Sequence, residues 1–595
     1  MLQRRGSRVR GADCRSGRAP DRRGHLRAGR SRAGGERPRR RRGRHRPARR
    51  PRSRAGRLGS PRATRPRLPH YARRPLTRPH TRHVSEGEVP GTGAVDVDVA
   101  IIGSGAAGIA AGIEALDAGA SVLVFEAESD PGGAAIISGG GCLLVGTSLQ
   151  ARLGIRDSPA LAFDDWMSLG GPTADAEWAR RYVEASAREV GVWAERFGVE
   201  WTDIVQHEGN SVPRWARPRL GGFGLMRALL AAFRARGGAL RTSASAERLA
   251  LRAAAGGDAG RGPGRAVELD IAIRGGTIRV HATSLVVATG GFASNLELVL
   301  RHRPDLAAAD IRVGSGPGAT GRGHALVESI GGTMTNLDKI WCYPYGIPDP
   351  REAMPEHGVA FRRVPGNIWI NRRGQRFHNE ELSGGMSGAA AVLGQLPGRS
   401  WAIIDAGMTV ELELANPPYQ RDGRPDRSAI ARFLEHSPHV ATAPTLDELA
   451  QRIGVPAAAL AATVASYNGA GAARRGAAAD EFGRAIAGRR PIAEPPFTAL
   501  EMRLLARKTL GGVRTDLRCR VVDDKGRPIA GVFAAGEVSG MAGGRINGAA
   551  ALEGTMLGPS LLSGRVAGAW AAHAAGFGNG WRVAAGIGSG GDADA

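Results

Sequence analysis

The stretch VAIIGSGAAGIAAG, residues 99–112, runs from a short apolar segment through three spaced glycines into small helix-forming residues. The apolar segment predicts a buried parallel strand, and the residues after the glycines predict a helix. Gly103, Gly105 and Gly108 form a GxGxxG pattern: the first permits a tight turn, the second lets a pyrophosphate approach the backbone, and the third lets helix and strand pack closely. Ala106 opens the helix, whose positive end favours phosphate. The stretch therefore predicts a dinucleotide-binding βαβ unit.

A second apolar segment, ASVLVFEAE at residues 120–128, predicts the next strand and places Glu126 at its end. An acidic residue about 20 positions after the glycines is part of this motif, because its carboxylate accepts hydrogen bonds from ribose hydroxyls. A glycine-lined loop follows, and its small side chains would let it lie against the face of a large flat cofactor. The loop residues that we expect at the cofactor are Gly132, Gly133, Ser138, Gly139, Gly140 and Gly141.

Near the other end of the chain, GVFAAGEVSG at residues 531–540 predicts a strand that ends in Gly536 and Glu537. Arg545 and a helix-prone segment from Ala549 come after it. A nucleotide-binding unit that is begun by the N-terminal part and completed by the C-terminal part suits an extended dinucleotide. NAD and FAD share the N-terminal pattern, so the choice between them has to come from the rest of the chain.

The positive charge of the chain is concentrated at its start. The formal net charge is +26, but residues 1–83 hold 30 arginines and only three acidic residues, which leaves 52 basic and 53 acidic residues elsewhere. We expect residues 1–94 to form a disordered Arg-rich tail, because too few apolar residues are present to offset the entropy of ordering. The tail is either an arm that binds nucleic acid or translated upstream sequence ahead of a start near Val84. We favour the second, so nucleic acid is not an expected partner.

The four cysteines lie far apart and show no CxxC, haem or iron–sulfur spacing. We therefore expect no metal site and no redox centre besides the nucleotide cofactor, and the cysteine usage fits a reducing cytoplasm. The twin arginines Arg4 and Arg5 lack the apolar segment of an export signal, and no apolar run reaches membrane-spanning length. Neither export nor a membrane partner is expected.

Six ordered motifs point to a known family. GSGAAG with FEAESDPGG, SGGGC, LVVATGGFASN, INRRGQRFHNEE, GGVRTDLRCRV, and GVFAAGEVSG with RINGAAALEGTMLGPSLLSGRVAG follow one another between about Val95 and Gly576. Together they resemble the flavoprotein family of fumarate reductase and succinate dehydrogenase, whose relatives include 3-ketosteroid dehydrogenases. The resemblance implies FAD. It also implies an α/β fold in which a Rossmann-like FAD-binding domain, built from N- and C-terminal segments, carries an inserted α+β capping domain.

The resemblance divides the chain and adds residues at the cofactor. It implies a first part of the FAD-binding domain at residues 95–341, a capping and substrate domain at 342–507, a second FAD-binding part at 508–578 and a flexible C-terminus at 579–595. Glu537 would meet the ribityl chain, and the C-terminal helix would point its positive end at the flavin. Other residues implied at FAD are Ala288, Thr289, Gly290, Gly291, Ala551 and Leu552. No histidine precedes the glycine loop, so non-covalent binding is expected.

The candidate catalytic residues also come from the resemblance. Arg545 in GGRING matches an arginine that holds a substrate carboxylate or carbonyl, and Arg363 matches a proton-relay arginine. Tyr343 and Lys508 stand where the fumarate reductases have two substrate-binding histidines, and Gly384 stands where those enzymes have the arginine that acts as the acid. Lys508 is notable by itself, because the chain has 79 arginines and only three lysines, and an ammonium titrates where a guanidinium does not.

These residues predict an FAD-dependent oxidoreductase that dehydrogenates or reduces a CH–CH bond next to a carbonyl or carboxylate, by hydride transfer at flavin N5. Arg545 would polarise the activating group, and Tyr343, Lys508 or a nearby arginine would carry the proton. The partners are then a small-molecule substrate with an activated C–C bond and an external electron acceptor. Two alternatives stay open: a flavin oxidase or hydroxylase of C–N or C–O bonds, and an Arg-tailed nucleic-acid-binding flavoprotein without turnover.

Overall fold

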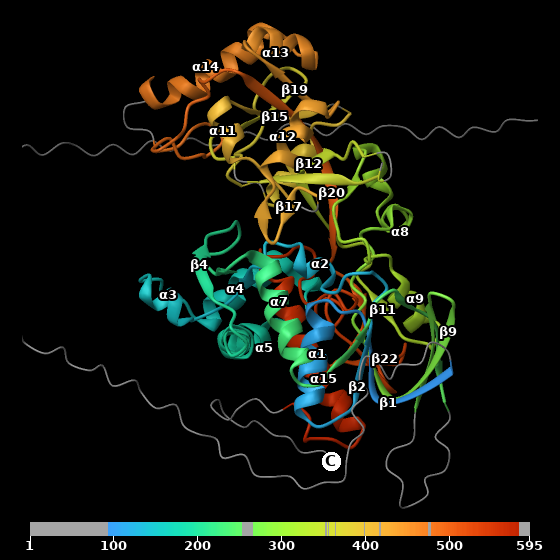
Figure 1. Cartoon of the computed structure of the whole chain (residues 1–595). Helices are drawn as coiled ribbons and strands as arrows, with labels where there is room; N and C mark the ends of the chain where they lie inside the picture. The colour runs from blue at the N-terminus through green and yellow to red at the C-terminus, as the bar shows by residue number, and fades with distance from the viewer. Residues whose placement is uncertain are drawn as a thin grey trace, which may run out of the picture. The chain divides into compact units, whose positions relative to one another are not determined.

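In the computed structural model, the glycine-rich turn follows β1 of a mostly parallel sheet, four of whose strands, β1, β2, β9 and β22, are labelled in Figure 1. The strand order is β22-β23-β9-β1-β2-β6, and β8 and β7 extend the sheet beside β9. β1 pairs in parallel with β2 and β9, β2 with β6, and β23 with β9. The five parallel strands thus have the order 3-2-1-4-5 of a dinucleotide-binding fold. The bounds are β1 Gly93–Ile102, β2 Val122–Phe125, β6 Ala239–Arg241, β7 Ala244–Leu251, β8 Val267–Ile273, β9 Gly276–Val287, β22 Arg520–Val522 and β23 Pro528–Ala534.

Helices α1 (Ala106–Asp117) and α15 (Leu557–Ala574) join the two ends of the described chain beside this sheet (Figure 1). They approach closely because glycines face the contact: a Cβ on Gly564 would collide with the backbone of Ala107, and one on Gly568 with that of Ala111. The buried Arg565 guanidinium of α15 adds an ion pair to Glu114 of α1, with Nε and Oε1 2.6 Å apart. The C-terminal helix is therefore an integral part of the N-terminal βαβ unit.

α15 begins later than the sequence suggested. Residues 549–556 are irregular, because their backbone groups bond to other segments: Ala549 N donates to Gly170 O at 3.0 Å, and Gly554 O accepts from Leu143 N at 3.0 Å. Gly554 also has a left-handed φ of 94°, which ends any helical run there. Pro559 lies in the first turn of α15, a position that needs no amide proton.

A second sheet has the order β14-β15-β20-β12-β13-β16, and β10 and β19 also pair with β20. Its apolar side chains form a separate core. β12 begins two residues before the expected domain boundary at residue 342, and β20 ends two residues after the boundary at residue 507. β10 lies wholly before the first of these boundaries. The strands are β10 Arg312–Val313, β12 Ile340–Pro348, β13 Gly358–Arg362, β14 Ile368–Asn371, β15 Ser400–Ile404, β16 Glu413–Leu414, β19 Val440–Ala443 and β20 Phe497–Thr509. The helices of this part are α10 Ser387–Leu393, α11 Ala406–Glu411, α12 Arg427–His436, α13 Leu446–Ile453 and α14 Ala457–Ala473.

A small antiparallel sheet, β3-β5-β4, and several helices complete the part of the fold around the glycine loop. Its strands are β3 Cys142–Leu143, β4 Trp201–Val205 and β5 Trp215–Pro218. The helices are α2 Gly133–Ile136, α3 Ser148–Arg152, α4 Pro159–Gly170, α5 Ala176–Ser186, α6 Trp193–Glu195 and α7 Gly221–Arg234. Elsewhere, α8 Leu296–His302 packs in the core of the second sheet and α9 Arg322–Glu328 in a core of the first. Two further two-stranded sheets pair β11 Met334–Thr335 with β21 Gly512–Val513 and β17 Gln420–Arg421 with β18 Arg424–Pro425.

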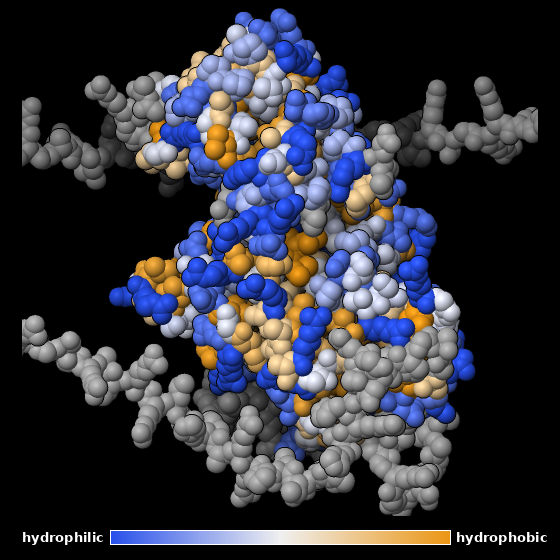
Figure 2. Space-filling model, in the orientation of Figure 1, coloured by the Kyte–Doolittle hydropathy of each residue, from blue (hydrophilic) through white to orange (hydrophobic). Residues whose placement is uncertain are grey.

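The structure describes residues 93–252, 266–351, 354, 356–362, 364–382, 384–397, 399–415, 418–473 and 478–581. The Arg-rich tail expected at residues 1–94 lies outside them except for its last two positions, and so does most of the C-terminus expected at 579–595. Within these ranges no helix is both long and apolar enough to cross a membrane. On the face drawn in Figure 2, hydrophobic residues lie in groups between hydrophilic ones.

Candidate active site

A cavity of about 2050 Å³ lies at the carboxyl ends of the parallel strands. Gly103 follows β1, Glu126 follows β2 and Ala288 follows β9, and all three line the cavity. Tyr343 of β12 and Arg362 of β13 line it from the second sheet. In open α/β sheets, ligands bind in the crevice at the carboxyl ends, where the strand order reverses. The cavity therefore combines a nucleotide-binding edge with side chains of the second sheet.

Glu126 and Ser104 are linked at the nucleotide-binding edge. The buried carboxylate of Glu126 accepts hydrogen bonds through Oε2 from the amide and the hydroxyl of Ser104, at 2.8 and 2.6 Å. The Ser104 hydroxyl oxygen in turn accepts from Gly132 N at 3.1 Å, which ties the glycine loop to the turn after β1. Ser104 was not among the residues expected at the cofactor, because its only signal in the sequence is a polar residue between the first two glycines.

The start of α1 offers the space that a pyrophosphate needs. An ideal Cβ on Gly105 would have no heavy atom of the described residues within 4 Å, whereas one on Gly108 would collide with the carbonyl oxygen of Gly103. Two further hydroxyl oxygens at the cavity, Thr289 Oγ1 and Ser315 Oγ, are buried and have no hydrogen-bond partner among the described residues. Open backbone, a helix N-terminus and unpaired hydroxyls fit a cofactor that carries phosphates and ribose.

Most residues expected at the cofactor line the cavity: Gly103, Gly105, Ala106, Glu126, Gly133, Ser138, Gly139, Gly140, Gly141, Ala288, Thr289, Gly290, Gly536 and Glu537. Gly108 lies behind the turn, as its packing role requires. The expectation for Ala551 and Leu552 needs correction, because both side chains are buried in the core of the N-terminal part and do not line the cavity. Gly132 and Gly291 also lie outside the lining; Gly291 instead packs against the side chains of Thr509 and Glu537.

Tyr343 is hydrogen-bonded to Glu553, a residue that was not expected from the sequence. The Tyr343 hydroxyl lies 2.8 and 2.9 Å from the two carboxylate oxygens of Glu553, and both residues line the cavity. Burial, together with the negative charge of Glu553, raises the pKa of Tyr343 well above its usual value. The phenol is therefore neutral around pH 7 and can donate a hydrogen bond to the carboxylate. Tyr345 stacks on the Tyr343 ring at 5.1 Å between centroids.

Lys508 lines the cavity beside Glu537, with Nζ and Oε2 3.8 Å apart. Burial lowers the pKa of the Lys508 ammonium, and the Glu537 carboxylate opposes that shift. The other oxygen of Glu537 accepts from the amide and hydroxyl of Thr509, at 3.0 and 3.3 Å. Arg507, which precedes Lys508, is also buried and donates from its guanidinium to Gly314 O. Lys508, Glu537 and Thr509 thus form one cluster of interacting polar residues at the edge of the cavity.

The placement of Arg545 corrects the expectation that it contacts substrate. Its side chain is exposed and does not line the cavity. Gly543 and Gly544, with left-handed φ values of 69° and 88°, turn the chain just before it, and Arg545 O accepts from Asp175 N at 3.1 Å. The loop therefore presents the guanidinium away from the site. Arg363, the other candidate arginine, lies outside the described residues.

Arg545→Ala is expected to keep turnover within about twofold of the wild-type value, since exposed substitutions away from a site change little. Steady-state kinetics of the purified variant would check this. A loss of tenfold or more would return Arg545 to the mechanism.

Residues 98–557 of the chain match the family model described as FAD binding domain. The chain belongs to this FAD-binding family. The KsdD-like steroid dehydrogenase of Mycobacterium tuberculosis is 32% identical over 555 residues, which cover 80% of this chain and 96% of that protein. The NADH:fumarate oxidoreductase of Klebsiella pneumoniae is 31% identical over 482 residues, which cover 80% of this chain and 48% of that protein.

Two solved structures share the fold. A flavocytochrome c3 fumarate reductase in an open conformation matches with a TM-score of 0.64 and 27% identity, over 82% of this chain and 80% of that one. The 3-ketosteroid-Δ4-(5α)-dehydrogenase from Rhodococcus jostii RHA1, in complex with 4-androstene-3,17-dione, matches with a TM-score of 0.59 and 29% identity, over 80% and 97% of the two chains.

These matches confirm the cofactor and the reaction class expected from the sequence. The cofactor is FAD, and the protein is an FAD-dependent oxidoreductase that acts on CH–CH bonds. None of the relatives named here favours the two alternatives, a C–N or C–O oxidase and a nucleic-acid-binding flavoprotein without turnover. The mixed α/β fold expected from the sequence is confirmed as well.

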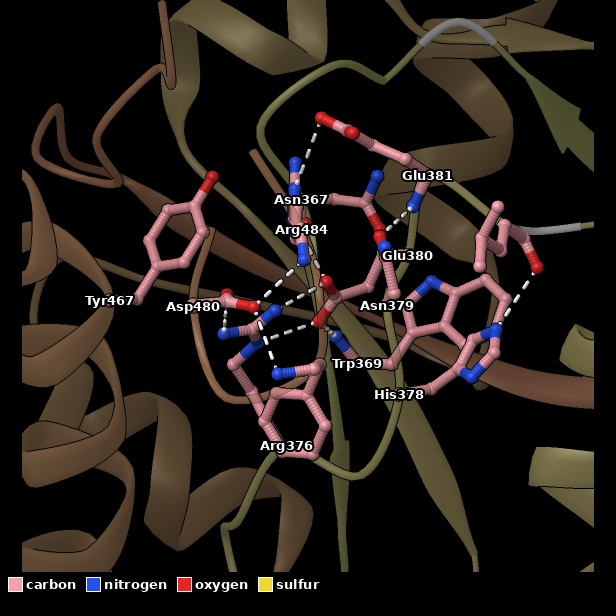
Figure 3. Close-up of polar contacts among 12 residues, drawn as sticks. Asn367, Trp369, Arg376, His378, Asn379, Glu380, Glu381, Tyr467, Asp480 and Arg484 are labelled. Atoms are coloured by element: carbon pink, nitrogen blue, oxygen red, sulfur yellow. Dashed lines mark hydrogen bonds and ion pairs between the residues drawn. The ribbon is translucent and has the colours of Figure 1, made fainter. Parts of the chain in front are cut away.

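A buried ion-pair network holds the segment RFHNEE, residues 376–381, next to the cavity (Figure 3). Arg376 pairs with Glu380 at 2.7 Å and with Asp480 at 2.8 Å, and Arg484 reaches Glu380 at 2.9 Å. These four side chains are at most 5% exposed. Because a buried charge left without its partner costs about 3–5 kcal/mol, the network fixes the position of Glu380, which lines the cavity.

Proposed function

We propose that the protein dehydrogenates or reduces a carbon–carbon bond next to the carbonyl of a bulky, mostly apolar substrate of the 3-ketosteroid kind. The observation that carries the proposal is a neutral phenol, Tyr343, held by Glu553 in an aromatic wall of the cavity. Tyr345 stacks on Tyr343, and Phe361 meets Tyr345 edge-on at 6.1 Å between centroids. The likeness to steroid dehydrogenases supports the same substrate class.

FAD, when bound, supplies the exchange of a hydride with the substrate carbon. The remaining task for the protein is to move one proton at the neighbouring carbon. During dehydrogenation, the Tyr343 oxygen accepts that proton while its own phenol proton passes to Glu553, and reduction reverses both transfers. The pair therefore acts as acid and base without forming a free phenolate, which suits a phenol whose pKa burial has raised.

We propose positioning roles for the cationic residues at the cavity. Lys508 holds Glu537 in place, and the hydroxyl groups of the cofactor chain would bind on the free side of that carboxylate. Arg362 and the buried Arg507 provide positive charge near the same wall. Positive charge there would stabilise the oxygen of a substrate enolate.

We also propose that the second-sheet part of the chain, which supplies Tyr343 and Arg362 to the cavity wall, acts as a cap over the flavin. Non-covalent FAD is supported by the loop from Pro131 to Gly141, which has no histidine. An external acceptor would receive the electrons. The three cysteines within the described ranges, Cys142, Cys342 and Cys519, are free and buried, which supports a reducing cytoplasm as the working compartment.

Anaerobic mixing of the yellow holoenzyme with candidate substrates tests the substrate class. Saturated and monounsaturated 3-ketosteroids should bleach the visible flavin absorbance, and succinate should not. In the other direction, the reduced enzyme should be reoxidised by an unsaturated ketosteroid and not by fumarate. Bleaching by succinate alone would contradict the proposal.

Glu553→Gln should lower kcat by a factor of about 10² or more, the usual contribution of one positioned acid–base group, with little change in KM. The introduced amide can still accept the phenol hydrogen bond through its oxygen but cannot take the proton. The pKa of Tyr343 should also fall when the negative charge is removed, so the alkaline limit of the activity moves to lower pH. A variant with an unchanged kcat and pH profile would remove Glu553 from the proton path.

A further inference from the structure

The loop between β4 and β5 brings two unpaired polar atoms to the cavity. Nε2 of His207 and Oε2 of Glu208 are buried, and neither has a hydrogen-bond partner among the described residues. Both residues line the cavity that Tyr343 and Glu553 also line. Native proteins rarely leave buried polar atoms unpaired unless a ligand, a water or a function requires them. We therefore expect a group bound in the cavity to form hydrogen bonds with these two atoms.

The two atoms are held in place by their own loop. Gln206 Nε2 donates to the carbonyl oxygens of His207 and Asn210, at 3.0 and 2.5 Å. The side chain of Asn210 accepts at 3.2 Å from Arg214, whose fully buried guanidinium pairs with Asp157 at 2.9 Å. The His207 ring meets Trp215 edge-on, with centroids 5.4 Å apart. A loop anchored in this way presents a preorganised binding surface.

The hydrogen-bonding capacity of His207 and Glu208 matches an uncharged ligand group that can both donate and accept a hydrogen bond. Burial lowers the pKa of His207, although the negative charge of Glu553 opposes the shift. At neutral pH the imidazole is therefore uncharged, with one ring nitrogen a donor and the other an acceptor. Gly384 provides no side chain to neutralise the carboxylate opposite it: an ideal Cβ there would lie 3.6 Å from Glu208 Oε2. A substrate carboxylate at this point would face a like charge.

We propose that His207 and Glu208 form a subsite for a hydroxyl group of the substrate. In this subsite the hydroxyl donates to Glu208 Oε2 and accepts from His207 Nε2 in the tautomer that carries the proton on that nitrogen. This inference rests on the proposed function in taking the substrate to occupy the same cavity. It adds a specificity: hydroxylated substrates are preferred, and dicarboxylates are rejected at this wall.

The first experiment measures the stability of the ligand-free holoenzyme and needs no substrate. Glu208→Leu and His207→Phe should leave Tm unchanged or raise it by about 2 °C, because each removes an unpaired buried polar atom. His207→Phe keeps the edge-on contact with Trp215. Glu381→Leu serves as the matched control, because that carboxylate lines the same cavity but already pairs with Arg484 at 3.4 Å. A fall of several degrees in both loop variants would show structural roles and overturn the proposal.

The second experiment uses two probes that differ in one group, 1,4-androstadiene-3,17-dione and its 17-hydroxy analogue. Calorimetric titration of the oxidised holoenzyme should show the hydroxy probe binding about tenfold more tightly, the effect of one hydrogen bond to a charged group. Glu208→Leu should abolish the preference, and Glu381→Leu should keep it. Equal affinities in the wild type would overturn the subsite.

The two proposals fail in different ways. If neither probe binds but the loop variants keep or gain stability, the ketosteroid substrate class is wrong and the subsite stands for another hydroxylated ligand. If both probes bind equally and the loop variants lose stability, the ketosteroid class stands and the subsite is wrong.

Discussion

The Tyr343→Phe variant will bind FAD as the wild type does and will lose turnover by a factor of about 10² to 10⁴, the usual contribution of one positioned acid–base group. The ring and its stacking on Tyr345 remain, so the cavity wall should keep its shape. Only the hydroxyl that meets Glu553 is lost. Rapid-mixing measurements of flavin bleaching would follow the chemical step directly, apart from product release.

Tyr345→Phe is the matched control for that experiment. Tyr345 lies in the same aromatic wall and lines the same cavity, but no described carboxylate meets its hydroxyl. Turnover in this variant should stay within a fewfold of the wild-type value. Should Tyr343→Phe turn over normally, the proton would have to travel through another group, and Lys508 would become the leading candidate.

Gly105→Leu is expected to yield a folded but colourless protein, with FAD affinity weakened by at least about 100-fold. The backbone at Gly105 has φ −66° and ψ −174°, which any residue can adopt, and an ideal Cβ there meets no described atom within 4 Å. The side chain would instead occupy the place where the pyrophosphate approaches α1. Flavin content after purification, with thermal unfolding as the test of folding, would decide the matter.

Substitutions at two other glycines serve as controls for this experiment. Gly469→Leu in α14 also enters open space but lies outside the cavity lining, so that variant should stay yellow. Gly108→Leu should fail to fold, since the new side chain would collide with the Gly103 carbonyl. A yellow Gly105→Leu protein with normal affinity would show that the cofactor does not approach this turn.

The nucleotide-binding edge could be predicted from the sequence because its signals are local. A strand, a GxGxxG turn and a helix follow one another within 20 residues, and Glu126 comes at the end of the next strand. Each of these residues acts through its backbone or at a strand end, where neighbours in sequence are neighbours in space. The structure places Gly103, Gly105 and Glu126 together at the cavity for that reason.

The reactive end of the cavity could not be predicted in the same way, because its partners are far apart in the sequence. Tyr343 and Glu553 are separated by 210 positions; the resemblance singled out Tyr343, but nothing in the sequence linked it to Glu553. Arg545 was assigned by matching residue types, yet two left-handed glycines turn it outward. His207 and Glu208 carry no sequence signal at all; only their burial without partners singles them out.

The contact between α1 and α15 has a consequence for biosynthesis. These helices lie at opposite ends of the described chain, and the glycines Gly564 and Gly568 fit against α1 without space to spare. During translation the N-terminal strands are synthesised first, but α15, which packs beside them against α1, is synthesised last. Domains fold largely as units while the chain is synthesised, so this one has to wait for its final helix. Flavin capture is therefore expected to be a late, post-translational event, and a ribosome-stalled chain that ends before residue 557 should not hold the cofactor.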